Sequence, residues 1–286
     1  MQITDKIHAI KINFQLVFSP ENIAERSVYA YVVFGEKIHL IDCGVAGAEK
    51  QIFSYLEANN RTKTDVANLI ISHAHPDHIG AAKAINEQTD CKVVYHNGDR
   101  DWIEDTERQF RERPIPGFHT LVGGSVSPDS LVKDGDRLQL EDGLVIDVIH
   151  TPGHSEGSIS LFLEQDGALV TADALPLPGD LPLYDDIGKS VASIKKLQQL
   201  EKVDVVFSSW EEPIQGNPKI QDRMQESLQL LRTVHETVCA NIEEDQDDMQ
   251  LCERVVKALS LPPFAVNPVM ARAFASSRKY RDTELF

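Results

Sequence analysis

A strand-like segment that ends in a cluster of histidines is the feature that most constrains this sequence. The apolar run Ile70–Ser72 leads directly into His73 and His75, and Asp77 and His78 follow in the next turn. Side chains at i and i+2 of a strand project to the same side, and a following turn can add a carboxylate and another imidazole. Helix capping by Asp77 would explain that residue alone. It would not explain imidazoles that repel one another when protonated, so the segment predicts a divalent cation.

The charge balance of the chain argues against polyanionic partners. Its 286 residues include 45 acidic and 28 basic side chains, which gives a formal charge of −17. A surface of that sign repels nucleic acid and anionic membranes at long range. We therefore expect a small-molecule substrate and no nucleic-acid or membrane partner. The sequence leaves the oligomeric state open, a homodimer included.

The sequence lacks the features that mark exported or membrane-bound chains. Residues 1–11 alternate as a strand would and lack the apolar core of a signal peptide. No run of about 18 apolar residues occurs that could span a membrane. The cysteines show no CxxC spacing; they are Cys43, Cys91, Cys239 and Cys252. We expect a cytoplasmic protein with reduced thiols.

Short apolar runs rich in β-branched residues predict a series of strands through the first three quarters of the chain. These runs are 28–34, 37–41, 68–72, 91–95, 144–149, 158–163 and 168–171. Amphipathic stretches of helical length lie between some of them, at 49–58, 78–88, 99–111 and 189–200. This order predicts an α/β fold in which two sheet-containing halves pack together and are covered by helices.

The character of the sequence changes near Pro218. Helical patterns then cover 220–241, 248–259 and 268–277. We therefore predict one domain over residues 1–217, which carries the histidine cluster, and a helical C-terminal region over residues 218–286.

The histidine segment and a strand upstream of it resemble the metallo-β-lactamase superfamily. His73, His75, Asp77 and His78 match the H-x-H-x-D-H motif of that family in full. Leu40–Gly44 resembles the family's strand that ends in an aspartate and a glycine beneath the metal site. The resemblance implies a four-layer αββα sandwich with a helical C-terminal appendage.

Two downstream segments extend the resemblance, which covers roughly residues 28–215. His150–Ser155 is similar to the family's T-P-G-H-[ST] segment and implies that His154 is the third histidine of a first metal. Leu169–Ala174 resembles the strand whose aspartate, here Asp173, bridges two metals.

The resemblance implies one set of metal ligands: His73, His75, Asp77, His78, His154 and Asp173. Zinc, as one or two ions, is the expected cofactor, with iron and manganese as alternatives. A divalent cation held in this way lowers the pKa of a bound water toward neutrality. Asp77 is placed to act as the catalytic residue that orients this water or accepts its proton. We therefore expect a metal-dependent hydrolase that cleaves a thioester, a lactone or a similar ester.

One position departs from the family pattern. A late strand of the family usually ends in a turn whose histidine completes the second metal site, and Trp210 stands at that place here. The indole nitrogen keeps its proton and has no free lone pair, so Trp210 cannot replace that ligand. Either Glu211 or Glu212 restores the second site if the turn aims a carboxylate inward; otherwise the second ion binds weakly or is absent.

Two alternatives to a hydrolase stay open, and the departure at Trp210 favours the first of them. Superfamily relatives that oxidise persulfides bind one iron through two histidines and an aspartate, so a single-metal site favours such an oxidoreductase. A non-catalytic metal-binding protein is the other alternative. A phosphodiesterase fits less well, because it needs two firmly held metals and tolerance of anions.

Substrate contacts are expected in segments around the site. The proline-rich stretch 175–184, which includes Tyr184, is a candidate pocket wall. The segment 111–124, which includes His119, is a candidate lid, and Trp210 is a third candidate contact. The terminal basic residues are Arg272, Arg278, Lys279 and Arg281. The resemblance to hydroxyacylglutathione hydrolase suggests that these cations bind carboxylates of a thiol carrier.

Overall fold

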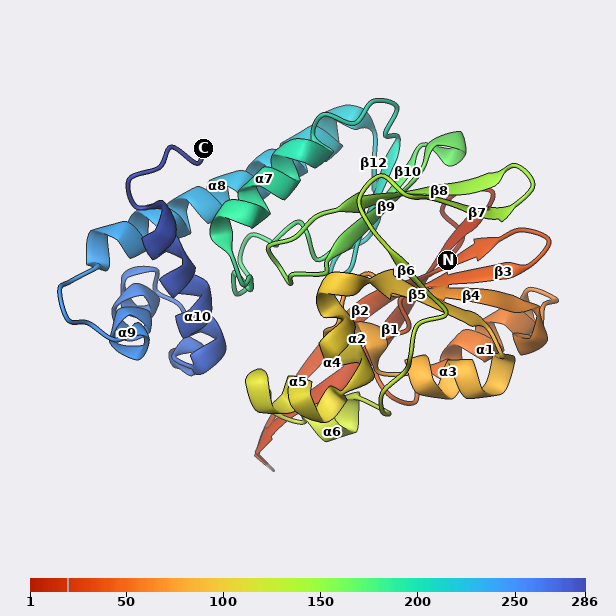
Figure 1. The fold of residues 1–286 in the computed structure, drawn as a ribbon, viewed down its shortest axis with the longest axis horizontal. Helices are drawn as coiled ribbons and strands as arrows, with labels where there is room; N and C mark the ends of the chain where they lie inside the picture. The colour runs from red at the N-terminus through yellow and green to blue at the C-terminus, as the bar shows by residue number, and fades with distance from the viewer. Residues whose placement is uncertain (20) are drawn as a thin grey trace.

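Two six-stranded sheets packed face to face form the centre of the computed structural model, which describes residues 1–19 and 21–286 (Figure 1). The first sheet has the strand order β1-β2-β3-β4-β5-β6, and the second has the order β12-β11-β10-β9-β8-β7. The first comprises β1 (Ile7–Ser19), β2 (Asn22–Phe34), β3 (Ile38–Ile41), β4 (Val66–Ile70), β5 (Lys92–His96) and β6 (Ser130–Val132). The second comprises β7 (Arg137–Glu141), β8 (Leu144–His150), β9 (Ile159–Leu163), β10 (Ala168–Ala172), β11 (Val205–Ser208) and β12 (Ile214–Gln215).

Helices cover the outer face of each sheet. The first sheet carries α1 (Glu49–Ala58), α2 (Pro76–Ile79), α3 (Ala82–Thr89), α4 (Arg100–Glu104), α5 (Thr106–Glu112) and α6 (Phe118–Leu121). On the second lie α7 (Ile187–Leu197) and α8 (Asn217–Asn241), and α9 (Asp248–Ala258) and α10 (Pro268–Ser276) pack against these two helices. Buried apolar side chains fill three layers, one between the sheets and one beneath each set of helices. The predicted four-layer αββα sandwich is confirmed.

The layer between the sheets explains why several strands are apolar at consecutive positions. Every residue of β3, β9 and β10 is buried, because both faces of these strands are covered. Tyr31 lies in this layer with its ring 5.1 Å from that of Phe207. Its hydroxyl donates a hydrogen bond of 2.6 Å to the carbonyl of Ser208, which removes the cost of burying that polar group.

Two stretches that the sequence analysis predicts as continuous helices are interrupted. The helix expected over 78–88 is divided into α2 and α3 near Gly80. A Cβ atom at Gly80 would lie 2.2 Å from the carbonyl oxygen of Leu121, so close packing of the backbones requires glycine. The helix expected over 99–111 is divided at Asp105, whose side chain accepts a hydrogen bond from the Arg108 backbone and caps α5.

The C-terminal helices share a core with the second sheet. The buried faces of α8, α9 and α10 contribute Leu231, Val255 and Phe274 to the same cluster as Leu169 of β10 and Val206 of β11. In Figure 1 these helices lie at the end of the sandwich opposite the hairpin turns of β3 and β7–β8. The division at residue 217 into two domains stays a prediction. Among the described residues, no helix is both long enough and apolar enough to cross a membrane.

Candidate metal centre

The carboxyl ends of β3 and β4, two neighbouring strands of the first sheet, bring the histidine segment together with Asp42. Asp42 follows β3 and His73 follows the neighbouring parallel strand β4, so both emerge at the carboxyl ends of their strands. The carboxylate of Asp42 accepts hydrogen bonds from the Ser72 backbone and hydroxyl, both at 2.7 Å. Asp42 has a φ of 58°, a left-handed conformation that aspartate tolerates better than most residues. The strand end is thus fixed before the histidines begin.

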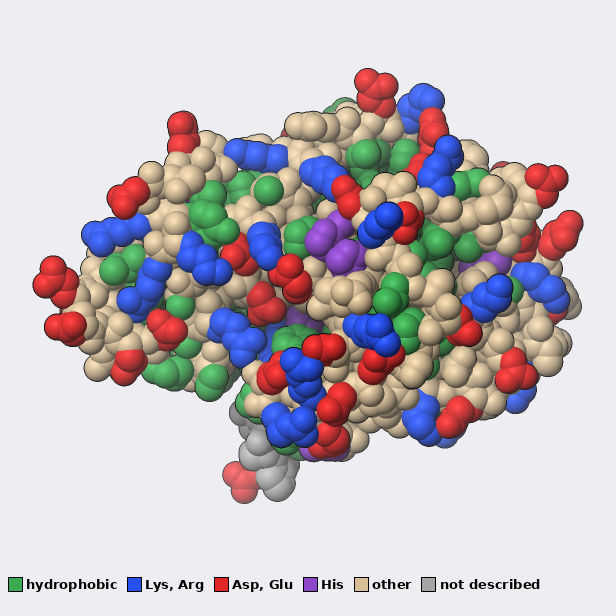
Figure 2. Space-filling view, viewed as in Figure 1, with side chains coloured by type: hydrophobic (Ala, Val, Ile, Leu, Met, Phe, Trp, Pro, Cys, Tyr) green, Lys and Arg blue, Asp and Glu red, His purple; other side chains and the backbone are tan. Residues whose placement is uncertain are grey.

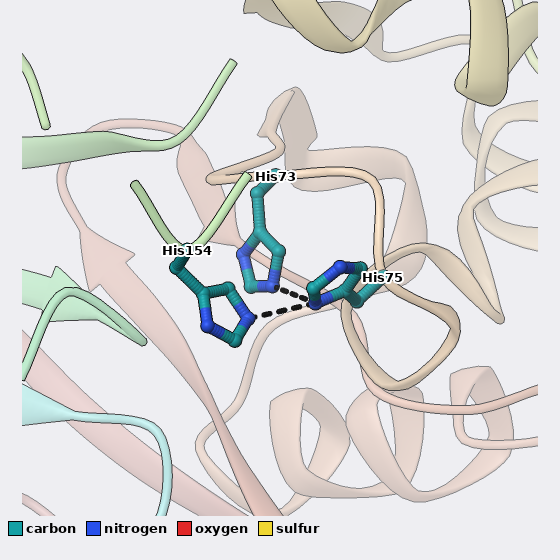
Figure 3. Close-up of side chains that lie close together, drawn as sticks. All are labelled: His73, His75 and His154. Atoms are coloured by element: carbon teal, nitrogen blue, oxygen red, sulfur yellow. Dashed lines mark hydrogen bonds between the residues drawn. The ribbon is translucent and has the colours of Figure 1, made fainter. Parts of the chain in front are cut away.

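Three imidazoles from two distant parts of the chain converge on one point (Figure 3). Nε2 of His73 lies 3.1 Å from Nδ1 of His75, and Nε2 of His154 lies 2.7 Å from the same Nδ1 atom. All three residues are buried. Tetrahedral zinc with bonds of about 2.0–2.1 Å holds its ligand nitrogens roughly 3.3 Å apart. The spacing of these nitrogens therefore fits a small divalent cation.

A second group lies beside the first. Nε2 of His78 is 3.5 Å from Oδ2 of Asp77 and 3.3 Å from Oδ1 of Asp173. These three atoms are buried and have no hydrogen-bond partner among the described residues. The other oxygen of Asp173 lies 3.3 Å from Nε2 of His154, so this carboxylate stands between the two groups. Buried polar atoms without partners are costly, and a cation bound by them would remove that cost.

The outer nitrogens of these rings are held by fixed groups. Nδ1 of His78 is 2.8 Å from Asp42, and Nδ1 of His154 is 2.9 Å from the carbonyl oxygen of Leu183. Nδ1 of His73 is 3.0 Å from the hydroxyl of Ser72. Such partners fix the tautomer and orientation of metal-binding imidazoles. In each of these three histidines, Nε2 points into the site and stays free to bind a cation.

Burial and charge set the protonation of the site. Burial holds the pKa of His73 and His75 well below the ordinary histidine value, so both rings are neutral, the form that binds cations. Burial acts in the same direction on His78, but nearby carboxylates, Asp173 first, raise its pKa well above the ordinary value. Burial raises the pKa of Asp77. It acts likewise on Asp173, but the histidines, His78 first, outweigh it and hold that pKa well below the ordinary value.

A buried aspartate that the sequence analysis missed joins the two halves of the site. Asp99 accepts hydrogen bonds from the Ala74 backbone at 2.8 Å and the Ser155 hydroxyl at 2.7 Å. Its other oxygen accepts from the Gly157 backbone at 2.7 Å. A Cβ atom at Gly157 would lie 2.4 Å from the Asp99 backbone nitrogen, so glycine permits this approach. Asp99 therefore holds the His73–His75 segment against the turn that carries His154.

Comparison with known proteins identifies the family. The sequence profile of the metallo-β-lactamase superfamily matches residues 23–210. The chain belongs to the metallo-β-lactamase superfamily. It is a metal-dependent hydrolase with a buried site of histidines and aspartates.

Individual members of the superfamily resemble this chain over most of its length. A probable metallo-hydrolase of Methanocaldococcus jannaschii is 27% identical over 203 residues, which are 68% of this chain and 89% of that protein. A metallo-β-lactamase family protein of Thermus thermophilus superposes with a TM-score of 0.70 at 19% identity, over 94% of this chain and 93% of that one. A class B3 di-zinc metallo-β-lactamase from an Alaskan soil metagenome superposes with a TM-score of 0.57 at 21% identity, over 73% and 90% of the two chains.

The structure places Trp210 beside the metal ligands of this superfamily member but does not bring Glu211 or Glu212 to them. Nε1 of Trp210 donates a hydrogen bond of 2.9 Å to Oδ2 of Asp173. The carboxylate of Glu211 is instead 2.7 Å from Nε of Arg223 in α8, and Glu212 is exposed. The expectation that a glutamate of this turn restores the second site is therefore not met by this geometry.

The loop 175–184 lines a hollow next to the site, although Tyr184 does not. A hollow of about 60 Å³ touches His154, Asp173 and Trp210 and is lined further by apolar loop residues, Leu175, Leu181 and Leu183 among them. Tyr184 is instead buried in the core beneath α7, with 4% of its surface exposed. His119 is exposed and lies 3.2 Å from Glu107, away from both groups of ligands. Trp210 alone of the three candidate contacts lines the hollow.

Proposed function

We propose that this metallo-hydrolase cleaves a thioester, a lactone or a similar ester of a small molecule, with zinc held by His73, His75 and His154. The observation that carries the proposal is the convergence of three buried imidazoles beside a hollow with leucine side chains in its wall. A divalent cation at this point supplies a water of lowered pKa and polarises a carbonyl oxygen. The zinc-containing relative of the same fold supports the choice of metal.

Asp77 is the candidate proton acceptor. Its Oδ2 atom is buried without a partner and lies within 3.5 Å of His78, at the inner side of the site. A carboxylate in this position can orient a water or take its proton during attack on an acyl carbon. The same Nε2 atom of His78 lies 3.3 Å from Oδ1 of Asp173, so the three side chains form one group.

The hollow beside His154 and Asp173 supports an apolar acyl group. Leu175, Leu181 and Leu183 present aliphatic side chains to it, and the ring of Trp210 closes one side. Arg26 and Asp180, which form an ion pair of 3.1 Å, also line it, and a largely apolar wall with a few placed polar groups is typical of small-ligand sites. The net charge of −17 supports a small molecule in preference to nucleic acid.

Kinetics on zinc-loaded protein test this proposal. A panel of thioesters, lactones and phosphodiesters would be compared for wild type and for Asp77→Asn. We expect turnover of acyl substrates, and a loss of about 100-fold or more in kcat for Asp77→Asn. Elemental analysis would show that the variant keeps at least its first ion. Preference for phosphodiesters, or one iron per chain with oxygen uptake, would overturn the proposal.

A further inference from the structure

Arg113 is a buried arginine beside the metal centre for which the chain supplies no partner. It follows α5 directly, and its backbone N–H donates a hydrogen bond of 2.7 Å to the carbonyl of Gln109. Only 8% of its surface is exposed. Among the described residues, no hydrogen bond or ion pair is made by its guanidinium, and Nε is wholly buried. A buried guanidinium without a partner destabilises the fold, because it has lost its hydration and gained no hydrogen bond in return.

The other buried arginine shows how this protein treats such a group when its role is structural. Arg223 is 6% exposed, and its guanidinium is bound on every side. It lies 2.7 Å from Glu211, 2.6 Å from the hydroxyl of Ser227 and 3.3 Å from the carbonyl oxygen of Leu175. Arg113 has the burial of Arg223 without these contacts, which points to a ligand outside the chain.

The wall that carries Arg113 is anchored to the metal centre. The side chain of Gln109, one turn earlier, donates a hydrogen bond of 2.6 Å to the carbonyl of Ala74, between His73 and His75. The ring of Trp102 lies 6.5 Å from that of His75, and its Nε1 donates to Glu112 at 2.7 Å. Arg113 therefore lies on the side of the site where Trp102 and Gln109 contact the His73–His75 segment, near enough to His75 for its charge to act on that ring.

Charged groups surround Arg113 at a distance, but none of them pairs with its guanidinium. Burial lowers the pKa of its guanidinium, and carboxylates, Asp185 first and then Asp77, act against that effect from a distance. Within the described part of the chain, neither carboxylate forms an ion pair with Arg113, and its Nε has no hydrogen-bond partner. Arg272 of α10 approaches from the other side and donates a hydrogen bond of 2.6 Å to the carbonyl of Glu112. Figure 2 shows acidic and basic side chains side by side on this face, between the C-terminal helices and α5.

We propose that Arg113 binds a carboxylate of the substrate and selects acyl compounds that carry one. The claim that the bound carboxylate belongs to a substrate rests on the proposed function. The claim that Arg113 binds a carboxylate does not. The planar guanidinium matches a carboxylate through paired hydrogen bonds. A phosphate dianion would meet stronger repulsion from the nearby aspartates than a carboxylate of single charge.

Ligand binding tests the site without any turnover. The chain has 2 tryptophans, Trp102 and Trp210, and both lie beside the metal centre, so their fluorescence can report binding in zinc-loaded full-length protein. The probes would be dicarboxylates from malonate to adipate, each compared with the monocarboxylate of equal chain length. A monocarboxylate can bind either the metal or Arg113, whereas a dicarboxylate of suitable length can bind both at once. We expect the best dicarboxylate to bind about tenfold to a hundredfold more tightly than its monocarboxylate.

Matched variants locate that preference. Arg113→Met should abolish it, and Arg113→Lys should keep only part of it, because lysine retains the charge without the planar fork. Arg111→Met is the control, since Arg111 lies in α5, two residues before Arg113, with 64% of its side chain exposed. Removal of an unpaired buried charge should leave the melting temperature of Arg113→Met unchanged or raise it. A preference that survives in Arg113→Met, or inorganic phosphate that binds as tightly as the best dicarboxylate, would overturn the proposal.

Hydrolysis supplies the second readout. In the first substrate pair, the 4-nitrophenyl hemiester of adipate carries a carboxylate on the acyl group, and 4-nitrophenyl hexanoate is its neutral counterpart. In the second pair, S-acetyl thioglycolate carries the carboxylate on the leaving group, and its amide is the neutral counterpart. We expect Arg113→Met to raise KM at least about tenfold for the charged member of one pair and to leave the neutral member unchanged. Equal losses on both members would overturn the proposal. If wild type cleaves none of these esters but binds dicarboxylates through Arg113, the proposed function fails while the carboxylate site stands.

Discussion

The indole Nε1 of Trp210 donates its hydrogen to Oδ2 of Asp173 over 2.9 Å. This oxygen is the one that faces His154 at 3.3 Å. In the family pattern, a histidine at the position of Trp210 would offer a lone pair to a second cation. Here the same place is taken by a donor that binds the carboxylate of Asp173. Trp210 therefore offers no lone pair to a cation, and it also restrains a neighbouring carboxylate.

We therefore expect Trp210→His to strengthen the second position. The imidazole would stand beside Asp173 and His78, and the zinc content should rise from about one toward two ions per chain. Trp210→Phe is the control, because it removes the hydrogen bond and adds no ligand. Elemental analysis after extensive dialysis measures the stoichiometry. An identical zinc content in both variants would contradict the placement of this turn beside the second position.

His154 is the residue on which the first position depends most. It is the only ligand of that group from the second half of the chain, and Nε2 points at His75 from 2.7 Å. His154→Ala should reduce zinc affinity by about 100-fold or more and abolish turnover. His119→Ala, at an exposed histidine, is the control. Competition with a chromogenic chelator measures the affinity, and wild-type affinity in His154→Ala would refute the assignment.

Asp42 should matter for the second position because it orients His78 from behind. It holds Nδ1 of His78 at 2.8 Å and fixes Ser72 at the strand end. Asp42→Asn should weaken the second ion by about 10-fold to 100-fold, because it removes a charged orienting partner. Asp90→Asn is a matched control at an exposed residue with a similar φ of 55°. Calorimetric titration with zinc compares the two variants, and equal affinities would contradict this role.

The fold and the groups that face the cation could be predicted because they depend on local patterns. The strand before His73, the turn before His154 and the strand before Asp173 each carry a motif, and the order of these motifs predicts the sandwich. Asp99 and Arg113 could not be found in this way. Each is a single residue in a segment without a motif, and its contacts come from chain segments far away.

Pairings across the fold also decide where the turn after β11 directs its side chains. The sequence alone allows Glu211 to point toward the site, but Arg223 on α8 binds its carboxylate.

Packing in the core likewise decides the place of Tyr184. It lies next to pocket-lining residues in the sequence, yet its ring packs beneath α7. Interruption of the helices at Gly80 and Asp105 depends likewise on close contacts and capping that a periodic pattern does not contain.

Asp186 links the end of the chain to the start of α7. It caps α7 by accepting a hydrogen bond from the Lys189 backbone at 3.1 Å. It also accepts from the hydroxyl of Tyr280 at 2.8 Å and from Lys279 at 3.0 Å. Burial raises the pKa of Asp186, but these donors, the Lys189 backbone first, outweigh it and hold the pKa below the ordinary value.

The lowered pKa of Asp186 predicts how its contribution depends on pH. Since the folded pKa lies below the unfolded value of about 3.9, the stabilisation is complete above that value and is lost as pH falls through the folded pKa. Asp186→Ala should lose about 1–2 kcal/mol at neutral pH, through the cap and the Tyr280 contact. Urea unfolding at a series of pH values measures the difference from wild type, with Asp222→Ala, at an exposed position of α8, as control. The difference should stay constant above about pH 5 and shrink below the unfolded value. A difference that grows as pH falls would show that the carboxylate does not hold the C-terminal helices in this way.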